Sequence, residues 1–222
     1  MTRTFLAGHS SISGVTVTLH EYSRTEDQGK TVVLYHAFVH GPVTSGPFSL
    51  FSWPINLRQP AKIIDGVTFG PDGIVMCAGR LSGECGSADK PDDPVNFTFT
   101  PALGEPVRLA LISDDQKTTI LFGIVPEPLV KSAGACTIEA IRLLPAWQLV
   151  LIRATGFKPG EALHFSSQSY REKHNGEVKA DSSGDYASAL MPFVQTKTSG
   201  ATKVEVRGSA CAPSLSFDWG RP

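Results

Sequence analysis

The sequence predicts an all-β protein that consists of two β-sandwiches in tandem, and three observations lead to that prediction. Apolar and polar residues alternate over short stretches, as they do in strands that bury one face. No window of about 11 to 18 residues keeps apolar residues at the helical spacings, and 21 glycines and 16 prolines interrupt the chain. The same order of strand-like segments and turns occurs twice, which indicates two domains.

The individual strands follow from two kinds of pattern. Strict alternation predicts half-buried strands of about five residues at 15–19, 95–99, 203–207 and 215–219. Residues 31–39 and 147–154 are apolar on both faces, so we expect them to be central strands covered on two sides.

The repeat is visible in the order of these segments. Each half has a long apolar strand, a Gly/Pro corner, a second strand, an Asp/Gly hairpin and further alternating strands. In the first half these lie at 32–39, 41–47, 48–53, 71–73 and 107–125; in the second they lie at 149–154, 156–160, 163–169, 183–185 and 203–219. A short proline-spaced link at 125–134 separates the halves. The predicted domains are therefore residues 12–128 and 134–222.

The second half also resembles a known family. Its corner Ala154-Thr155-Gly156-Phe157-Lys158-Pro159-Gly160-Glu161 is followed by an Asp-Ser-Ser-Gly-Asp-Tyr turn and a closing Val-Glu-Val-Arg-Gly strand. Together they resemble bacterial immunoglobulin-like modules of secreted and surface proteins, over roughly residues 136–220. The first half matches more loosely, because its corner lacks Pro-Gly-Glu. Its close-set Cys77 and Cys85 are similar to the neocarzinostatin type of immunoglobulin-like domain, which binds an apolar ligand in a crevice. The resemblance implies two immunoglobulin-like sandwiches and carries no chemistry.

Charge and hydropathy exclude several classes of partner. The formal net charge is −1 and the Lys and Arg residues are scattered singly, so we expect neither a nucleic-acid surface nor a membrane-surface helix. No apolar run approaches the roughly 20 residues that span a bilayer. The apolar run within residues 1–8 is too short for the core of a secretory signal. We therefore expect either a cytoplasmic protein or a mature, trimmed chain.

The four cysteines favour the second of these possibilities. They form no C-x-x-C motif and no Cys/His cluster with zinc spacing. Their positions predict two disulfides, Cys77–Cys85 around a Gly-rich loop and Cys136–Cys211 across the second half. Loop entropy would give the longer link about 4 kcal/mol and the shorter about 2.5 kcal/mol. Disulfides predict a periplasmic, secreted or cell-surface location. The alternative is a cytosolic protein with four buried thiols.

Familiar catalytic motifs are missing, and two histidines are the remaining catalytic candidates. The sequence has no G-x-S-x-G, phosphate-binding or H-E-x-x-H motif. His36 and His40 lie on one face of one predicted strand, about 13 Å apart at a rise of ~3.3 Å per residue. They could share a metal only with help from a neighbouring strand, which His9 or His20 could supply. The alternative is that they are ordinary surface histidines.

An acidic loop and an aromatic strand are the two candidate binding features. Asp89, Asp92 and Asp93 offer oxygen ligands of the kind that calcium takes. Their spacing does not match an EF-hand, and a solvated proline-rich loop is the alternative. Phe51 and Trp53 lie on the opposite face of their strand from Phe48 and Leu50. If that face is exposed, it is a platform for sugars or apolar ligands; the alternative is that it is covered.

The function we expect from these features is non-catalytic. A disulfide-linked double sandwich without a catalytic motif suits an extracytoplasmic binding, adhesion or envelope-accessory protein. Its partner would be a protein, a glycan or a small apolar ligand, and it would need no cofactor beyond possible calcium. The alternative is a secreted hydrolase of esters, lactones or glycosides. Its site would lie in a cleft between the domains and use His36, His40 and the acidic loop, with or without calcium.

Overall fold

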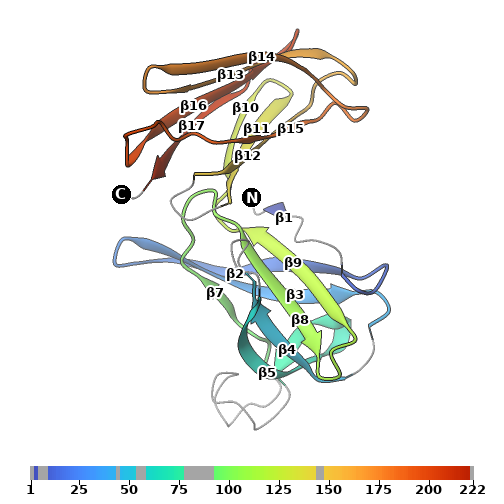
Figure 1. The fold of residues 1–222 in the computed structure, drawn as a ribbon. Helices are drawn as coiled ribbons and strands as arrows, with labels where there is room; N and C mark the ends of the chain where they lie inside the picture. The colour runs from blue at the N-terminus through green and yellow to red at the C-terminus, as the bar shows by residue number, and fades with distance from the viewer. Residues whose placement is uncertain are drawn as a thin grey trace. The chain divides into compact units, whose positions relative to one another are not determined.

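The computed structural model describes residues 3–4, 10–43, 46–53, 59–77, 93–143 and 148–220 of the 222-residue chain. The described residues form β-strands, turns and a 3₁₀ turn without an α-helix, which confirms the all-β prediction (Figure 1). Among them, no helix has the length and apolar character needed to cross a bilayer. The chain divides into a first unit, Met1–Ala102 with Pro106–Glu127, and a second unit, Leu103–Glu105 with Pro128–Pro222.

The first unit contains a six-stranded and a three-stranded sheet with an apolar core between them. The six-stranded sheet has the order β1-β9-β8-β4-β5-β6, formed by β1 (Arg3–Thr4), β4 (Phe48–Ser52), β5 (Ala61–Phe69), β6 (Val75–Cys77), β8 (Val107–Ser113) and β9 (Thr119–Val125). The other sheet has the order β2-β3-β7, formed by β2 (Thr16–Asp27), β3 (Lys30–His40) and β7 (Phe97–Phe99). Both sheets contribute to the core, with Val33 and Tyr35 from one and Phe48 and Leu111 from the other.

The second unit contains two four-stranded sheets that also share one core. The first has the order β10-β11-β12-β15, formed by β10 (Leu129–Ala133), β11 (Cys136–Arg142), β12 (Val150–Thr155) and β15 (Tyr186–Leu190). The second has the order β14-β13-β16-β17, formed by β13 (Ala162–Ser169), β14 (Glu172–Lys179), β16 (Ser199–Arg207) and β17 (Ser214–Gly220). Ile138 and Ile152 of one sheet meet Val206 and Phe217 of the other in the core.

A disulfide joins the two sheets of the second unit. Cys136 in β11 is bonded to Cys211, which lies in the loop between β16 and β17, with their Cα atoms 6.1 Å apart. This confirms the predicted Cys136–Cys211 pair. Cys77 is also disulfide-bonded, but its predicted partner Cys85 lies outside the described residues, so the Cys77–Cys85 pair stays a prediction.

The repeat seen in the sequence recurs in the strand order of the two units. The order β14-β13-β16-β17 in the second unit corresponds to β5-β4-β8-β9 within the six-stranded sheet of the first. The corners also match, since Gly41 and Gly156 have φ values of 110° and 89°. A Cβ at either position would collide with a backbone carbonyl, that of Gly14 or Ala135. Their immunoglobulin-like identity stays a prediction.

The prediction that two strands are covered on both faces is wrong. β3 and β12 are central, as expected, since each has a neighbour on either side. On β3, however, Tyr35 and Ala37 are buried whereas His36 and Phe38 are only half-buried, and on β12 Arg153 is exposed. In a two-layer structure each sheet has one covering partner, so apolar residues on the outer face stay partly in water.

The second predicted hairpin is also corrected by the structure. The Pro71-Asp72-Gly73 turn does join neighbouring strands, β5 and β6. The turn at 183–185 joins β14 to β15, which belong to different sheets. The Asp181 carboxylate accepts hydrogen bonds from the backbone N–H groups of Ser183 and Asp185 at 2.8 and 2.9 Å. Such an Asp-centred turn reverses the chain but does not decide which strand comes next to which.

Both units extend beyond the predicted domain boundaries. Residues 129–133, assigned to the link, form strand β10 and pair with β11. Before residue 12, the Ser11 N–H donates to the Thr119 carbonyl at 2.8 Å, and the Ser10 hydroxyl accepts from the Leu121 N–H at 3.1 Å. The prolines of the link concealed β10, because a proline cannot donate a backbone hydrogen bond to a neighbouring strand. The residues after these prolines and before Gly134 are not restricted in this way.

The glutamate of the Pro-Gly-Glu corner is a structural residue. The Glu161 carboxylate accepts backbone hydrogen bonds from Ser209 at 2.5 Å and from Lys158 at 2.9 Å. These bonds favour the charged form, that from Ser209 most, and lower the pKa of Glu161 to about 2 from an ordinary value of 4.5. The corner is thereby tied to the segment that follows β16.

We expect this carboxylate to make the stability of the second unit depend on pH. Its pKa is lower in the folded protein, so its contribution is complete above pH 4.5 and disappears as the pH falls towards 2. The melting temperature of Glu161→Gln should therefore lie below that of the wild type at pH 7 and converge with it near pH 2. Thermal melts across this range measure the difference. The exposed Glu177→Gln on β14 is the control, and a gap that stays constant down to pH 2 would contradict the assignment.

Candidate binding surface on the first unit

The outer face of β4 carries the two aromatic residues that were predicted to form a platform. β4 pairs with β8 without a register shift, so its side chains alternate regularly. Phe48 and Leu50 are buried in the core, and Phe51 and Trp53 are half-buried. The face that holds Phe51 is therefore partly open to solvent.

Phe51 lies in an open depression with a volume of about 850 Å³. Strands β4, β5 and β8 and the turn between β8 and β9 provide its walls. The lining residues are Pro47, Ser49, Phe51, Lys62, Asp65, Gly66, Ile112, Ser113, Asp114, Gln116 and Thr119. Apolar surface from Phe51 and Ile112 is thus surrounded by hydroxyl, amide and charged groups.

An irregularity in β5 places two of its charged residues on this face. Lys62 and Asp65 are three residues apart, so in a regular strand they would point to opposite sides of the sheet. The pairing of β5 with β4 shifts register between Phe48 and Leu50 and again between Leu50 and Phe51. The second shift lies between Lys62 and Asp65: it adds Ile63 to β5, so that Asp65 points to the same side as Lys62. As a result Lys62 and Asp65 both line the depression.

The charged groups beside Phe51 are paired with one another. The Lys62 ammonium donates to Asp65 Oδ1 at 2.7 Å, and the buried Ser49 hydroxyl donates to the same oxygen at 2.6 Å. Lys62 and then Ser49 lower the pKa of the Asp65 carboxyl, so it is ionised at neutral pH. Lys62 Nζ also lies 5.8 Å from the centre of the Phe51 ring. The aromatic ring is therefore bordered by a donor and an acceptor that are paired with each other.

The opposite wall is a tight turn held by its own side chains. The Ser113 hydroxyl donates to Asp115 Oδ1 at 2.6 Å, and the Lys117 N–H donates to the same atom at 3.1 Å. These bonds, that from Ser113 most, lower the pKa of Asp115. Gln116 takes a left-handed backbone conformation, with φ of 59°. The turn thus presents the side chains of Asp114 and Gln116 to the depression on a constrained backbone.

The two predicted platform residues differ in their surroundings. Trp53 is not among the residues that line the depression. The Arg108 guanidinium carbon lies 5.0 Å from the centre of the Trp53 ring, and Arg108 Nε donates to the Trp53 carbonyl at 2.9 Å. Both rings therefore have a cation beside them, but only Phe51 lines the depression.

A smaller apolar pocket adjoins the depression. It has a volume of about 370 Å³ and is lined by Val43, Gly46, Pro47, Thr68 and Phe69. Pro47 lines both cavities, so a ligand bound over Phe51 has an apolar recess beside it.

The two candidate catalytic histidines lie on the other sheet of the first unit. His36 Nε2 is 3.1 Å from Asn96 Oδ1, and His40 Nε2 is 3.1 Å from Thr18 Oγ1. These partners are an amide and a hydroxyl rather than the carboxylate that orients a catalytic base. A catalytic role for His36 and His40 stays a prediction that these contacts do not strengthen.

The predicted calcium loop is described only at its end. Asp89 and Asp92 lie outside the described residues, whereas Asp93 is exposed and its carbonyl accepts the Cys77 N–H at 3.2 Å. Within the described ranges, no group of three or more His, Cys, Asp or Glu residues could hold a metal ion. Calcium binding by Asp89, Asp92 and Asp93 stays a prediction.

Sequence reasoning missed Lys62, Asp65 and Ser49. Ser49 could have been found, because it shares a face with Phe51 on β4, but Lys62 and Asp65 share a face only through the register shift at Ile63 of β5. Comparisons with models of known protein families and with curated proteins found no match.

Proposed function

We propose that this protein is a non-catalytic extracytoplasmic binding protein and that the Phe51 depression holds a glycan. The observation that carries the proposal is the half-buried Phe51 ring at the edge of an open depression, bordered by Lys62, Asp65 and Ser49. The C–H face of a sugar ring stacks on an aromatic face, and its hydroxyls need donors and acceptors placed around that face. Phe51 and its neighbours supply both.

The charges of the depression support a neutral ligand. Lys62, Asp65 and Asp114 are its charged lining residues, and Lys62 is already paired with Asp65 at 2.7 Å. An anionic ligand would meet Asp114, which has no ion-pair partner among the described residues, and a cationic one would compete with Lys62. A neutral sugar exchanges hydrogen bonds with these groups without breaking the ion pair.

The disulfide supports an extracytoplasmic location. Disulfide bonds such as Cys136–Cys211 persist in oxidising compartments and are rare in cytosolic proteins. A periplasmic, secreted or surface location would also bring the depression into contact with envelope or host glycans, which fits an adhesion or envelope-accessory role.

Replacement of Phe51 is the direct test. We expect Phe51→Ala to lower the affinity for a bound glycan at least fivefold, because stacking and burial of the ring contribute ~1–2 kcal/mol. The protein should still fold, since Phe51 lies outside the core cluster of the first unit. Binding to an array of neutral oligosaccharides, followed by titration of the strongest ligand, measures the loss.

The matched control is Phe193→Ala, which removes a phenylalanine that is 45% exposed in the second unit. It should leave glycan affinity unchanged. Equal glycan affinity of Phe51→Ala and the wild type would show that the glycan does not bind at the Phe51 depression. A wild-type protein that binds no glycan on the array would exclude the glycan as ligand, and small apolar ligands would then be tested against the recess at Phe69.

A further inference from the structure

Histidines from adjoining strands lie opposite each other on the outer face of the three-stranded sheet. β2 and β3 pair antiparallel in a register that places His20 directly opposite His36. Opposed residues of an antiparallel pair point to the same side, with Cβ atoms roughly 4.5–5.5 Å apart. Asn96, which precedes β7, continues the row through its contact with His36. The row His20, His36 and Asn96 thus crosses three neighbouring segments.

The ring of His36 is oriented from two sides. Its Nε2 lies 3.1 Å from Asn96 Oδ1, and an amide oxygen can only accept, so Nε2 carries the proton and Nδ1 keeps a free lone pair. The Tyr22 ring stacks on it with centroids 4.6 Å apart and an angle of 29° between the planes. A histidine whose N–H donates to a carbonyl oxygen while its other nitrogen is free has the arrangement found in metal-binding histidines.

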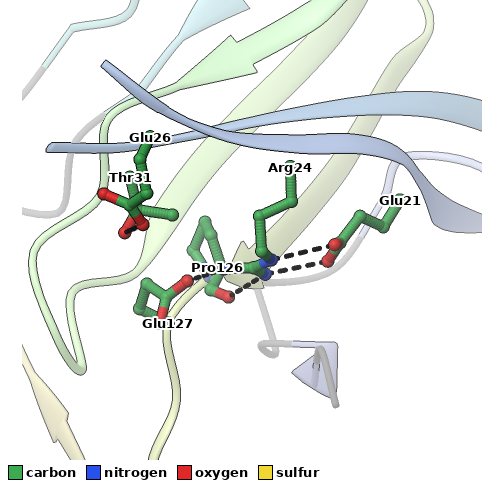
Figure 2. Close-up of polar contacts among 6 residues, drawn as sticks. All are labelled: Glu21, Arg24, Glu26, Thr31, Pro126 and Glu127. Carbon is green, nitrogen blue, oxygen red and sulfur yellow. Dashed lines mark hydrogen bonds and ion pairs between the residues drawn. The ribbon is translucent and has the colours of Figure 1, made fainter.

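Tyr22 lies on this face, two residues after His20, at a β-bulge. Glu21 pairs with Tyr35 and Ser23 pairs with Leu34, so Tyr22 is the additional residue of β2. The bulge is held from the other side by Arg24, whose Nε and Nη2 donate to the two Glu21 carboxylate oxygens at 2.9 and 2.8 Å (Figure 2). Arg24 also contacts the Glu127 carboxylate. The bulge is therefore fixed by ion pairs, and the Glu21 carboxylate is engaged with Arg24.

We propose that His20 and His36 form a binding site for a divalent transition-metal ion such as zinc, nickel or copper. Imidazole nitrogen is a preferred ligand of these ions, at about 2.0–2.1 Å for zinc, and two rings on opposed residues can reach one ion. The remaining coordination positions are left to water or to a donor from a bound partner. The site lies on the sheet that does not contain the Phe51 depression, and it does not depend on the proposed glycan function.

Binding requires a movement of His20. Its exposed ring lies against Phe38, with centroids 4.9 Å apart, and must turn towards His36 to share an ion. Exposed side chains change rotamer within picoseconds to nanoseconds, so this movement is accessible. Two protein ligands form an open site that binds more weakly than a closed structural zinc site.

His40 provides a matched control on the same strand and face. It lies four residues beyond His36, and its partner on β2 is Thr16 rather than a histidine. The His40 ring is instead 3.1 Å from the Thr18 hydroxyl. Loss of His40 removes a histidine from this sheet without removing either proposed ligand.

Titration of the tag-free full chain with zinc chloride and with nickel chloride tests the proposal. Calorimetry should show one zinc ion per chain, and histidine ring resonances of His20 and His36 should move. We expect His20→Ala and His36→Ala each to weaken binding at least about tenfold, and His40→Ala to change it less than about twofold. Asn96→Ala should weaken it by a smaller factor, because Asn96 only orients His36.

Circular dichroism establishes that each variant is folded, and His20→Ala is the decisive one because His20 is exposed. Zinc affinity in His20→Ala equal to that of the wild type would overturn the proposal. So would a loss of binding in His40→Ala that matches the loss in His36→Ala, or a wild type that binds neither ion.

Discussion

Removal of the Cys136–Cys211 disulfide should lower the free energy of unfolding of the second unit by about 4 kcal/mol. The bond joins residues 75 positions apart, so it removes much of the conformational entropy of the unfolded chain. It also links β11 of one sheet to the β16–β17 loop of the other. Since domains of this size are stable by roughly 5–15 kcal/mol, a double Cys136→Ala/Cys211→Ala variant should be close to unfolding.

Urea denaturation followed by tryptophan fluorescence measures this loss, because Trp219 is only 2% exposed in the core of the second unit. The midpoint for the second unit should fall, while that of the first unit stays constant. The control is chemical reduction of the wild type, which should lower the second midpoint to that of the variant. An unchanged midpoint in the double variant would show that the link contributes nothing to stability.

Replacement of Ser169 by alanine should destabilise the second unit by ~2–4 kcal/mol. The Ser169 hydroxyl accepts hydrogen bonds from Trp219 Nε1 and from the Thr202 hydroxyl, both at 2.9 Å, and donates to the Pro192 carbonyl at 2.7 Å. Trp219 and Thr202 are 2% and 1% exposed. Without the Ser169 hydroxyl, the buried Trp219 N–H and Thr202 O–H groups would lose this acceptor. Water has little access to take its place.

Urea denaturation of Ser169→Ala, with Ser166→Ala as the control, measures the cost. Ser166 lies on the same strand and faces the outer, polar side, where it lines a groove with Lys173 and Lys203. We expect its replacement to cost less than about 0.5 kcal/mol. In a Trp219→Phe background the indole donor is absent, so the cost of Ser169→Ala should become smaller. Equal costs in both backgrounds, or a loss no larger than that of Ser166→Ala, would rule out the network.

Local pattern predicted the strands and their buried faces well. Leu215, Phe217 and Trp219 alternate with polar residues, and all three are buried in β17. The same reasoning separated Phe48 from Phe51 on β4. It failed for residues 129–133, where prolines on the amino-terminal side concealed a strand, and for residues 183–185, where a turn was mistaken for a hairpin. In both cases a local signal was used to infer a neighbour that it does not specify.

The candidate sites depended on an irregularity and on a strand pairing that no periodic pattern contains. Phe51 was predicted because β4 is regular. Lys62 and Asp65 share its face only because β5 has a register shift at Ile63, and His20 lies opposite His36 only through the pairing of β2 with β3. A bulge changes the direction of every later side chain by one position, so a sequence analysis that assumes period two assigns them to the wrong face.

The sequence by itself determined the class of the fold and the core-facing residues of its regular strands, because side-chain alternation and turn chemistry are local properties of the backbone. Only the tertiary structure decided which strands became neighbours, that β3 has one open face, and that His20 lies opposite His36. The reason is physical. Strand pairing is selected by the free energy of burying a whole core, to which residues far apart in the chain contribute together.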